Sequence, residues 1–430
     1  MSKKITYSDP PLADILLCCL HQDQSLYPSE RLANLTAGQW QALVELAGEH
    51  RVVPLLYERL MALGIPDVSE EQAPFTPALE NLQAYSHQVA RNNLGHYGEI
   101  SKLLRRANQK GIPTILLKGI YLAEGIYKNP GLREMNDIDV LFQCSDLKKA
   151  FMMLTDMGYS TEKPIHFGKG SNIDKLISQS HHLPPMVKPH TAKFEIHWNI
   201  SHPAKAYSIE PKELWERAET VTVAGEKAMM LTPEDNLLHL CIHTSYQHMF
   251  SFGIRPFCDI AEMMRHFGSQ MNWDAFIERA FRYRWDRGVF LSLVIARDFT
   301  GAAIPLDVFE RLQPDGYDPL MAETAKAQIF TDKATSGWVS SPIINFATGK
   351  NVGEMVKAVL IQIFLPQTLM TKRYPVQPGS LMLYAYYGVR CWQVLLRHTV
   401  GVLRLSRGDA YLLGIVRRKK KLNQWMNAEL

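Results

Sequence analysis

The feature that most constrains the fold is a change in hydrophobic period near Gly111. Before it, apolar residues recur at helical spacing, and a long helix is predicted to begin at Thr76-Pro77, with the threonine as its N-cap. After it come two short apolar runs bounded by turn residues, 114–117 and 138–142, which predict buried strands. The chain therefore changes from a helical region to a sheet at this point.

A third strand and a return to helices complete the pattern. Residues 193–198 alternate in polarity, as a half-buried strand does, and after Glu226 the helical period returns. The run 232–235 (Thr-Pro-Glu-Asp) predicts a helix start with a hydroxyl cap, an early proline and acids at the positive end of the helix dipole. Helices are expected as far as residue 300, then a looser region over 301–349, and helices again beyond it.

These patterns predict an α+β protein in which a small mixed β-sheet core lies between N-terminal and C-terminal helical regions. We expect an N-terminal helical region at 1–110 and the sheet core at 111–228. A helical subdomain that closes a cleft is expected at 229–300, and a C-terminal helical region with a basic tail at 301–430.

Two carboxylates stand two residues apart on the second predicted strand. Residues i and i+2 of a strand lie on one face, about 6.6 Å apart, so Asp137 and Asp139 project together while Ile138 and Val140 face the core. Two acids so close repel each other unless a cation compensates them. They are therefore candidate ligands of Mg²⁺ or Mn²⁺, which take oxygen donors. A D-x-D pair alone also fits two surface acids beside a turn.

A third carboxylate and a lysine-glycine turn make the pattern more specific. On the third strand Glu195 shares a face with His197, and pairing beside the second strand would complete a three-acid metal cluster suited to nucleotidyl or phosphoryl transfer. Gly119 lets backbone amides approach a phosphate, and a helix is expected to begin at Ile120. Lys118 and Arg133 are candidates to bind a triphosphate.

Several further polar residues are weaker candidates. His239 and His243 are spaced as zinc ligands can be, but no glutamate stands between them to act as a metalloprotease base; we interpret them as core or rim histidines, one of which lines the cleft. His182, beside His181, is a candidate nucleotide contact, with a structural role as the alternative. Asp259 is expected to line the cleft or to cap a helix.

Composition and charge bound the remaining possibilities. With 46% hydrophobic residues, six scattered cysteines and no C-x-x-C pair, the chain resembles neither a disulfide scaffold nor a structural zinc protein, and we expect a cytoplasmic location. Between Lys372 and Lys421, eleven basic residues face one acid, Asp409, a net charge of +10. This tail predicts contact with an anionic surface, either nucleic acid or the periphery of a membrane; a solvated basic end is the alternative.

The motifs together resemble the nucleotidyltransferase-fold superfamily, that of DNA polymerase β, and within it a bacterial family of uncharacterised nucleotidyltransferases. The resemblance rests on Leu117-Lys118-Gly119, Tyr127, Leu132-Arg133 and Asp137-Ile138-Asp139, continues at 181–185, 195–198, 231–235 and 259–261, and covers about residues 50–300. It implies a nucleotidyltransferase-type core in which the three acids bind metal and activate an acceptor hydroxyl. The superfamily commonly has Gly-Ser or Gly-Gly where this chain has Lys118-Gly119-Ile120, a departure from the conventional triphosphate grip.

The predicted activity is transfer of a nucleoside monophosphate from a nucleoside triphosphate to an acceptor hydroxyl or phosphate, with release of pyrophosphate. The acceptor is open: a small molecule, a protein or RNA. Two alternatives remain. One is a non-catalytic nucleotide-sensing or antitoxin-like interaction protein with the same fold, and the other is an ATP-dependent phosphotransferase, which the same metal cluster supports.

Overall fold

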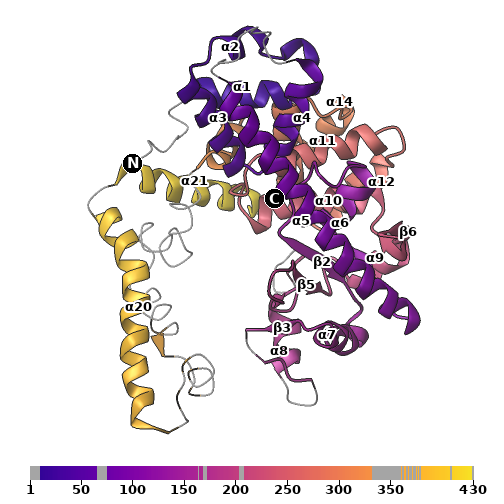
Figure 1. The fold of residues 1–430 in the computed structure, drawn as a ribbon, viewed down its shortest axis with the longest axis vertical. Coiled ribbons are helices and arrows are strands. Elements are labelled where there is room, and N and C mark those ends of the chain that lie inside the picture. Colours follow the sequence, from indigo (N-terminus) through magenta and orange to yellow (C-terminus); the bar gives the residue numbers. More distant parts are fainter. Residues whose placement is uncertain are drawn as a thin grey trace. The chain divides into compact units, whose positions relative to one another are not determined.

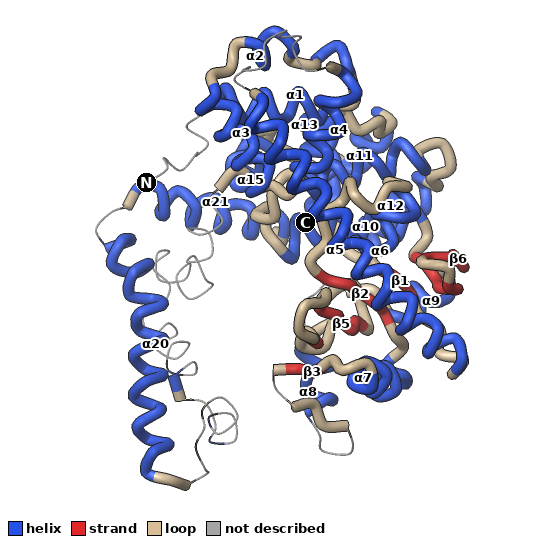
Figure 2. Tube along the Cα trace, viewed as in Figure 1, coloured by secondary structure: helices blue, strands red, loops and turns tan. Residues whose placement is uncertain are grey.

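The computed structural model describes residues 10–64, 75–162, 164–167, 172–202, 208–331, 379–406 and 409–428, together with isolated positions between 360 and 376. The chain forms two compact units, Met1–Ala322 and Glu323–Leu430. Figures 1 and 2 show the strands gathered at one end of the first unit, with helices making up the rest of it. Among the described helices, none combines the length and apolarity that crossing a bilayer requires.

A mixed sheet of seven strands lies in the first unit, which confirms the predicted α+β class. The strands are β1 (Ile115–Leu116), β2 (Asp137–Leu141), β3 (Ser160–Thr161), β4 (Met186–Val187), β5 (Lys193–His197), β6 (Glu219–Val223) and β7 (Glu226–Met230). Their order across the sheet is β3-β4-β5-β2-β1-β7-β6. The three predicted strands, β1, β2 and β5, are therefore neighbours at the centre of the sheet.

The register of the central strands fixes which side chains meet. β2 and β5 run parallel, with Asp139 opposite Glu195 and Asp137 opposite Lys193. The alternate residues Ile138 and Phe194 are fully buried on the other face. The second and third predicted strands therefore pair, which is the condition under which Glu195 joins the other two acids, and apolar burial on one face leaves the polar residues of both strands on the other.

Helices before the sheet agree with the predicted period. They are α1 (Pro10–Leu20), α2 (Ser29–Ala33), α3 (Ala37–Glu49), α4 (Val53–Leu63) and α5 (Thr76–Gln109). The predicted N-cap of α5 is wrong: Phe75 holds that position without a side-chain cap, and Thr76 is already helical. The centre of the Phe75 ring lies 6.0 Å from that of Trp40, so the residue that precedes α5 makes an aromatic contact instead of a capping hydrogen bond.

Helices also surround and follow the sheet. They are α6 (Lys118–Tyr121), the π-helical turn η2 (Leu122–Ile126), α7 (Leu147–Asp156), α8 (Asn172–Gln179), α9 (Pro211–Arg217), α10 (Pro233–Ile242), the π-helical turn η4 (His243–Gln247), α11 (Arg255–Phe267), α12 (Trp273–Arg282), α13 (Asp286–Thr300) and α14 (Leu306–Leu312). The helices predicted as far as residue 300 are present. The first helix after β1 begins at Lys118, two residues earlier than expected.

The hairpin of β6 and β7 corrects one expectation, that the helical period returns directly after Glu226. Residues 226–230 form β7, which pairs with β6 on one side and runs parallel to β1 on the other. Only Ala228 of this strand is fully buried, so its sequence lacks a clear alternation. The strand exists because β1 and β6 supply its hydrogen bonds.

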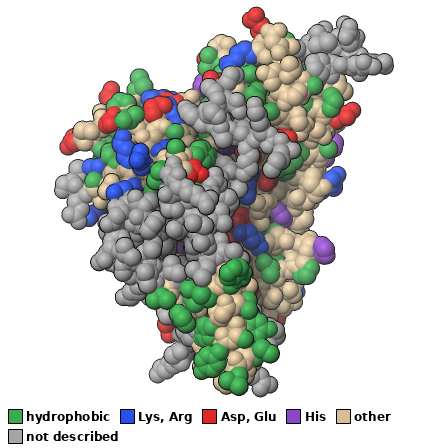
Figure 3. All heavy atoms as spheres, turned by 90° about the vertical axis from the view of Figure 1, so that its left-hand side faces the viewer, with side chains coloured by type: hydrophobic (Ala, Val, Ile, Leu, Met, Phe, Trp, Pro, Cys, Tyr) green, Lys and Arg blue, Asp and Glu red, His purple; other side chains and the backbone are tan. Residues whose placement is uncertain are grey.

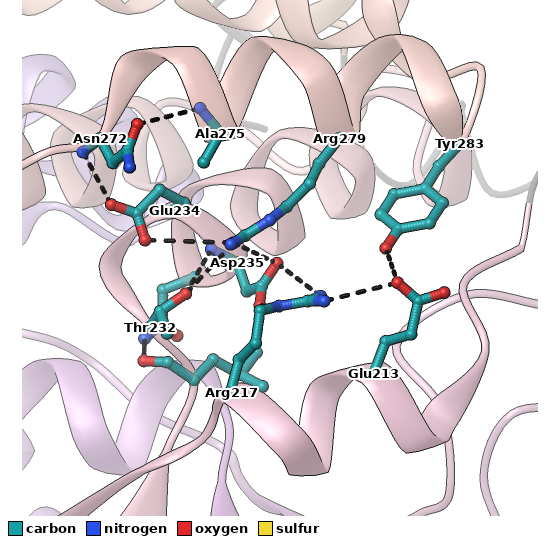
Figure 4. A network of polar contacts seen from close by, with 11 residues as sticks. Glu213, Arg217, Thr232, Glu234, Asp235, Asn272, Ala275, Arg279 and Tyr283 are labelled. Carbon is teal, nitrogen blue, oxygen red and sulfur yellow. Dashed lines mark hydrogen bonds and ion pairs between the residues drawn. The ribbon is translucent and has the colours of Figure 1, made fainter.

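The predicted start of α10 is confirmed, and its acids have a further role. Thr232 Oγ1 accepts a hydrogen bond from the Asp235 amide at 3.3 Å. The Asp235 carboxylate, almost fully buried, accepts from Arg217 of α9 at 2.8 Å and from Arg279 of α12 at 3.0 Å (Figure 4). This carboxylate therefore ties three helices together, and the helix dipole is a smaller part of its role.

The region expected to be loose contains two helices, which corrects that expectation. α14 occupies residues 306–312 and α15 (Leu320–Ile329) follows it; residues 332–349 lie outside the described part. The second unit contains α20 (Leu381–Ser406) and α21 (Ala410–Met426), and the basic run 417–421 lies within α21. Figure 3 shows hydrophobic side chains gathered near the start of α20, where Leu381 and Met382 are exposed.

Candidate metal and nucleotide site

The predicted carboxylates meet on the polar face of β2 and β5. Asp139, Glu195 and His197 each offer one ligand atom within 4.8 Å of the others, and Asp139 is buried while Glu195 is partly exposed. Asp137, one pleat earlier on β2, is the most exposed of the three acids, with 38% of its side chain accessible. Two carboxylates and an imidazole form a donor set suited to a divalent metal ion.

His197 is a member of this cluster that the sequence analysis did not assign to metal. Its Nε2 lies 3.1 Å from Asp139 Oδ1 and 3.9 Å from Glu195 Oε2. The side chain is 2% exposed, and Nδ1 has no hydrogen-bond partner among the described residues. The alternation of the strand had already placed Glu195 and His197 on one face, so the signal was present in the sequence.

Lys118 places a positive charge directly on the cluster. Its backbone has a φ of 42°, and its Nζ lies 3.1 Å from Asp139 Oδ2. Burial alone would raise the pKa of Asp139, but the Lys118 ammonium and the His197 hydrogen bond together hold that pKa well below its usual value. Asp139 is therefore a permanently charged carboxylate at neutral pH.

Only glycine fits at position 119, because the backbone there lies close to the side chains of Arg133 and Met135. A Cβ at this position would lie 2.7 Å from Arg133 Nη1 and 3.2 Å from the Met135 side chain. The glycine therefore lets the turn pack against Arg133. The helix that contains Gly119, α6, has only four residues before the π-helical turn, so it carries a small dipole.

Arg133 forms a buried ion pair with Asp259. Its Nε and Nη2 donate to the two carboxylate oxygens at 2.8 Å each, and Tyr127 donates a third hydrogen bond to Asp259 at 2.9 Å. Asn93 donates to the Arg133 carbonyl at 2.8 Å. Two of the three guanidinium nitrogens of Arg133 thus bind protein groups. Asp259 lines the cavity, in agreement with the expectation that it lines the cleft.

The three acids, Lys118, Gly119, Arg133 and Asp259 line one cavity of about 230 Å³, whereas His197 is not among the lining residues that the structure describes. It is lined by Lys118, Gly119, Arg133, Met135, Asp137, Asp139, Lys193, Glu195, Leu240, His243, His248, Phe252, Arg255, Pro256 and Asp259. Of the four residues predicted to bind nucleotide, Lys118, Gly119 and Arg133 belong to this lining. His182 is not among the described lining residues; its ring lies behind, with its centre 5.0 Å from that of His197.

The wall contributed by η4, α11 and the loop between them was largely missed from the sequence. Arg255 stacks on Phe252 at 5.2 Å and donates to the Glu134 carbonyl at 2.8 Å, whereas its Nε has no partner among the described residues. Burial and the nearby Arg133 lower the pKa of Arg255 to about 10. The ring nitrogens Nε2 of His243 and His248 are 3.2 Å apart. Arg255 is therefore the cation that this wall offers to an anion, since burial lowers the pKa of both histidines and favours their neutral forms.

Buried histidines predict a fall in stability under mild acid. Burial, with the charge of Lys118, lowers the pKa of His248 to about 4 and that of His239 well below its ordinary value. The unfolded chain therefore binds more protons below pH 6.5, and the free energy of unfolding is expected to fall between pH 6.5 and about 4. The slope is about 1.4 kcal/mol per pH unit for each such histidine.

Urea unfolding at pH 7.0, 6.0 and 5.0 measures this slope. His239→Gln is expected to reduce it, because glutamine does not take up a proton. The exposed His87→Gln is the matched control and should leave the slope unchanged. Equal slopes for the wild type and His239→Gln would show that His239 is not held neutral by burial.

The comparison with known families agrees with this geometry. A family model described as an uncharacterised nucleotidyltransferase matches residues 36–301, more than half of the chain, and the chain therefore belongs to this family. The match contains β1, β2 and β5 and ends within the loop after α13. No curated protein and no solved structure matches the chain.

Proposed function

We propose that this protein is a metal-dependent nucleotidyltransferase that moves a nucleoside monophosphate from a nucleoside triphosphate to an acceptor hydroxyl or phosphate and releases pyrophosphate. The observation that carries the proposal is the pairing of Asp139 with Glu195 on adjacent parallel strands, with His197 beside them, at the edge of a cavity that Lys118 and Arg255 also line. The family of the chain supports the reaction class. The fold of DNA polymerase β and its relatives is the proposed wider relationship.

The chain offers separate groups for the metal and for the substrate. Asp137, Asp139 and Glu195, with His197, are the proposed ligands of Mg²⁺ or Mn²⁺; imidazole in the set favours Mn²⁺. The bound ion would supply charge neutralisation at the transferring phosphate and a more acidic acceptor hydroxyl. Glu195, which is more exposed than Asp139, is the proposed acceptor of the proton from that hydroxyl.

The phosphates of the nucleotide are proposed to lie between Lys118 and Arg255. Both cations line the cavity, and the Arg255 Nε is a buried donor without a partner among the described residues. Gly119 and Arg133 line the cavity beside these cations in this proposal. Because Nε and Nη2 of Arg133 bind Asp259, a direct contact between Arg133 and nucleotide would use Nη1. A contact between His182 and nucleotide stays a prediction, as do the cytoplasmic location and the anionic contact of the basic tail, on nucleic acid or a membrane.

Labelled nucleotides test the reaction class. The full chain is incubated with Mg²⁺ or Mn²⁺ and with nucleoside triphosphates labelled at the α or γ position, alone and with cell extract. Transfer of α label with release of pyrophosphate is the expected result. Transfer of γ label would instead identify a phosphotransferase, and absence of turnover with metal-dependent nucleotide binding would identify a nucleotide-sensing protein.

A further inference from the structure

Lys193 occupies a position between two of the proposed metal ligands. Its Nζ lies 3.0 Å from Glu195 Oε1 and 3.2 Å from Asp137 Oδ2. The parallel register of β2 and β5 sets Lys193 directly opposite Asp137, so the lysine and all three acids share one face of the sheet. The ammonium group therefore lies where a cation shared by Asp137 and Glu195 would bind.

The charges of the cluster are largely balanced by protein groups. Lys118 pairs with Asp139, and Lys193 pairs with Asp137 and Glu195. Three carboxylates and two ammonium groups leave a single net negative charge before any metal arrives. A divalent ion entering this arrangement would meet two ammonium groups within a few ångströms and carboxylate oxygens that are already engaged.

Lys118 and Lys193 differ in how easily each ammonium group can move away from the carboxylates it pairs with. Lys118 is 13% exposed and starts from a fixed turn packed on Arg133, whereas Lys193 is 36% exposed at the beginning of β5. Lysine is also a flexible point charge with four methylenes, which swings between partners at little cost in geometry. Lys193 is therefore the ammonium that an incoming metal ion can displace.

We propose that Lys193 is a built-in counter-cation: it holds Asp137 and Glu195 together in the metal-free protein and competes with the divalent ion for them. Metal binding releases its ammonium into the cavity, where the phosphates of the substrate are the available anionic partner. The inference rests on the proposed function, because it assigns the three acids to metal.

The test is the affinity of the full chain for Mn²⁺, measured by isothermal titration calorimetry without nucleotide. Lys193→Met removes the charge and keeps the length of the side chain, so Mn²⁺ is expected to bind about tenfold more tightly than in the wild type. Lys193→Arg keeps the charge and should bind like the wild type. Lys188→Met is the matched control, because Lys188 pairs with Glu99 at 3.3 Å, is 31% exposed and does not line the cavity.

Thermal unfolding gives a second readout. Without metal, Lys193→Met leaves Asp137 and Glu195 to repel each other and should lower the Tm; saturating Mn²⁺ should raise the Tm more in this variant than in the wild type. If the variant is unfolded without metal, Mn²⁺ is expected to restore its folding. Failure of that rescue would overturn the counter-cation role.

The two levels of proposal fail differently. Equal or weaker Mn²⁺ binding by Lys193→Met, with clear binding by the wild type that Asp139→Asn abolishes, overturns the role of Lys193 and leaves the metal site intact. Absence of Mn²⁺ binding in the wild type and in Lys193→Met overturns both, because the acids then hold no metal.

Discussion

Replacement of Asp139 by asparagine is expected to lower nucleotidyl transfer about a thousandfold, which corresponds to roughly 4 kcal/mol of activation free energy. Asp139 is the most buried of the three acids and joins Lys118 to His197. Asparagine keeps the shape of the side chain but removes the charge that neutralises both a metal ion and Lys118. The loss should therefore appear in metal binding as well as in the rate.

The measurement is the initial rate of transfer from α-labelled nucleoside triphosphate, together with a Mn²⁺ titration and a circular dichroism spectrum to show that the variant is folded. Asp156→Asn is the control, since Asp156 is an exposed acid at the end of α7 and outside the cavity. Wild-type turnover by folded Asp139→Asn would show that the reaction takes place elsewhere.

Replacement of Asp259 by asparagine is expected to destabilise the protein by about 3–5 kcal/mol, the usual cost of removing one partner of a buried ion pair. Arg133 and Asp259 are 5% and 2% exposed, and their two hydrogen bonds are joined by a third from Tyr127. In the Asp259→Asn variant the Arg133 charge stays buried without a counter-charge. One of the two carboxylate oxygens that accept from Arg133 is replaced by an NH₂ group, which donates. The pair joins the segment between η2 and β2, which contains Arg133, to α11, which contains Asp259. Loss of the pair should therefore loosen the wall of the cavity that α11 forms.

Denaturant unfolding of the full chain measures this effect. Asp274→Asn is the matched control: Asp274 also pairs with an arginine, Arg311 at 2.7 Å, but it is 86% exposed. Breaking that surface pair should cost less than about 1 kcal/mol, because solvent screens it. Similar small shifts for both variants would mean that the buried pair contributes no more than a surface pair does.

The central strands could be predicted from the sequence because each is marked by a pattern of neighbouring residues. A short apolar run between turn residues, or a strict alternation, marks a strand wherever it stands. β2 and β5 have such signals, and their facing acids follow from the two-residue period. β7 has no such pattern, since only Ala228 is buried. It exists because it pairs with its hairpin partner β6 on one side and with β1, far earlier in the chain, on the other.

The candidate site divides in the same way. Asp137, Asp139, Glu195 and Lys118 lie on the segments with the clearest motifs, so they could be named from the sequence. Arg255 begins α11 and His248 follows η4, and neither stands in a motif that marks it for the site; the packing of α11 against α10 and η2 brings this part of the chain to the cavity. No spacing rule connects residues more than a hundred positions apart.

The sequence alone determined the class of the fold, the central strands, the face shared by Asp137 and Asp139, the face shared by Glu195 and His197, and the family resemblance, because each depends on residues close together in the chain or on strand geometry. The folded structure set Asp139 opposite Glu195. Only the tertiary structure decided which charges neutralise which. In the folded chain Arg133 pairs with Asp259 and Lys118 with Asp139. Lys193 pairs with both Asp137 and Glu195. Ion pairs form between whichever groups the packing brings within about 4 Å, and that distance is a property of the folded chain.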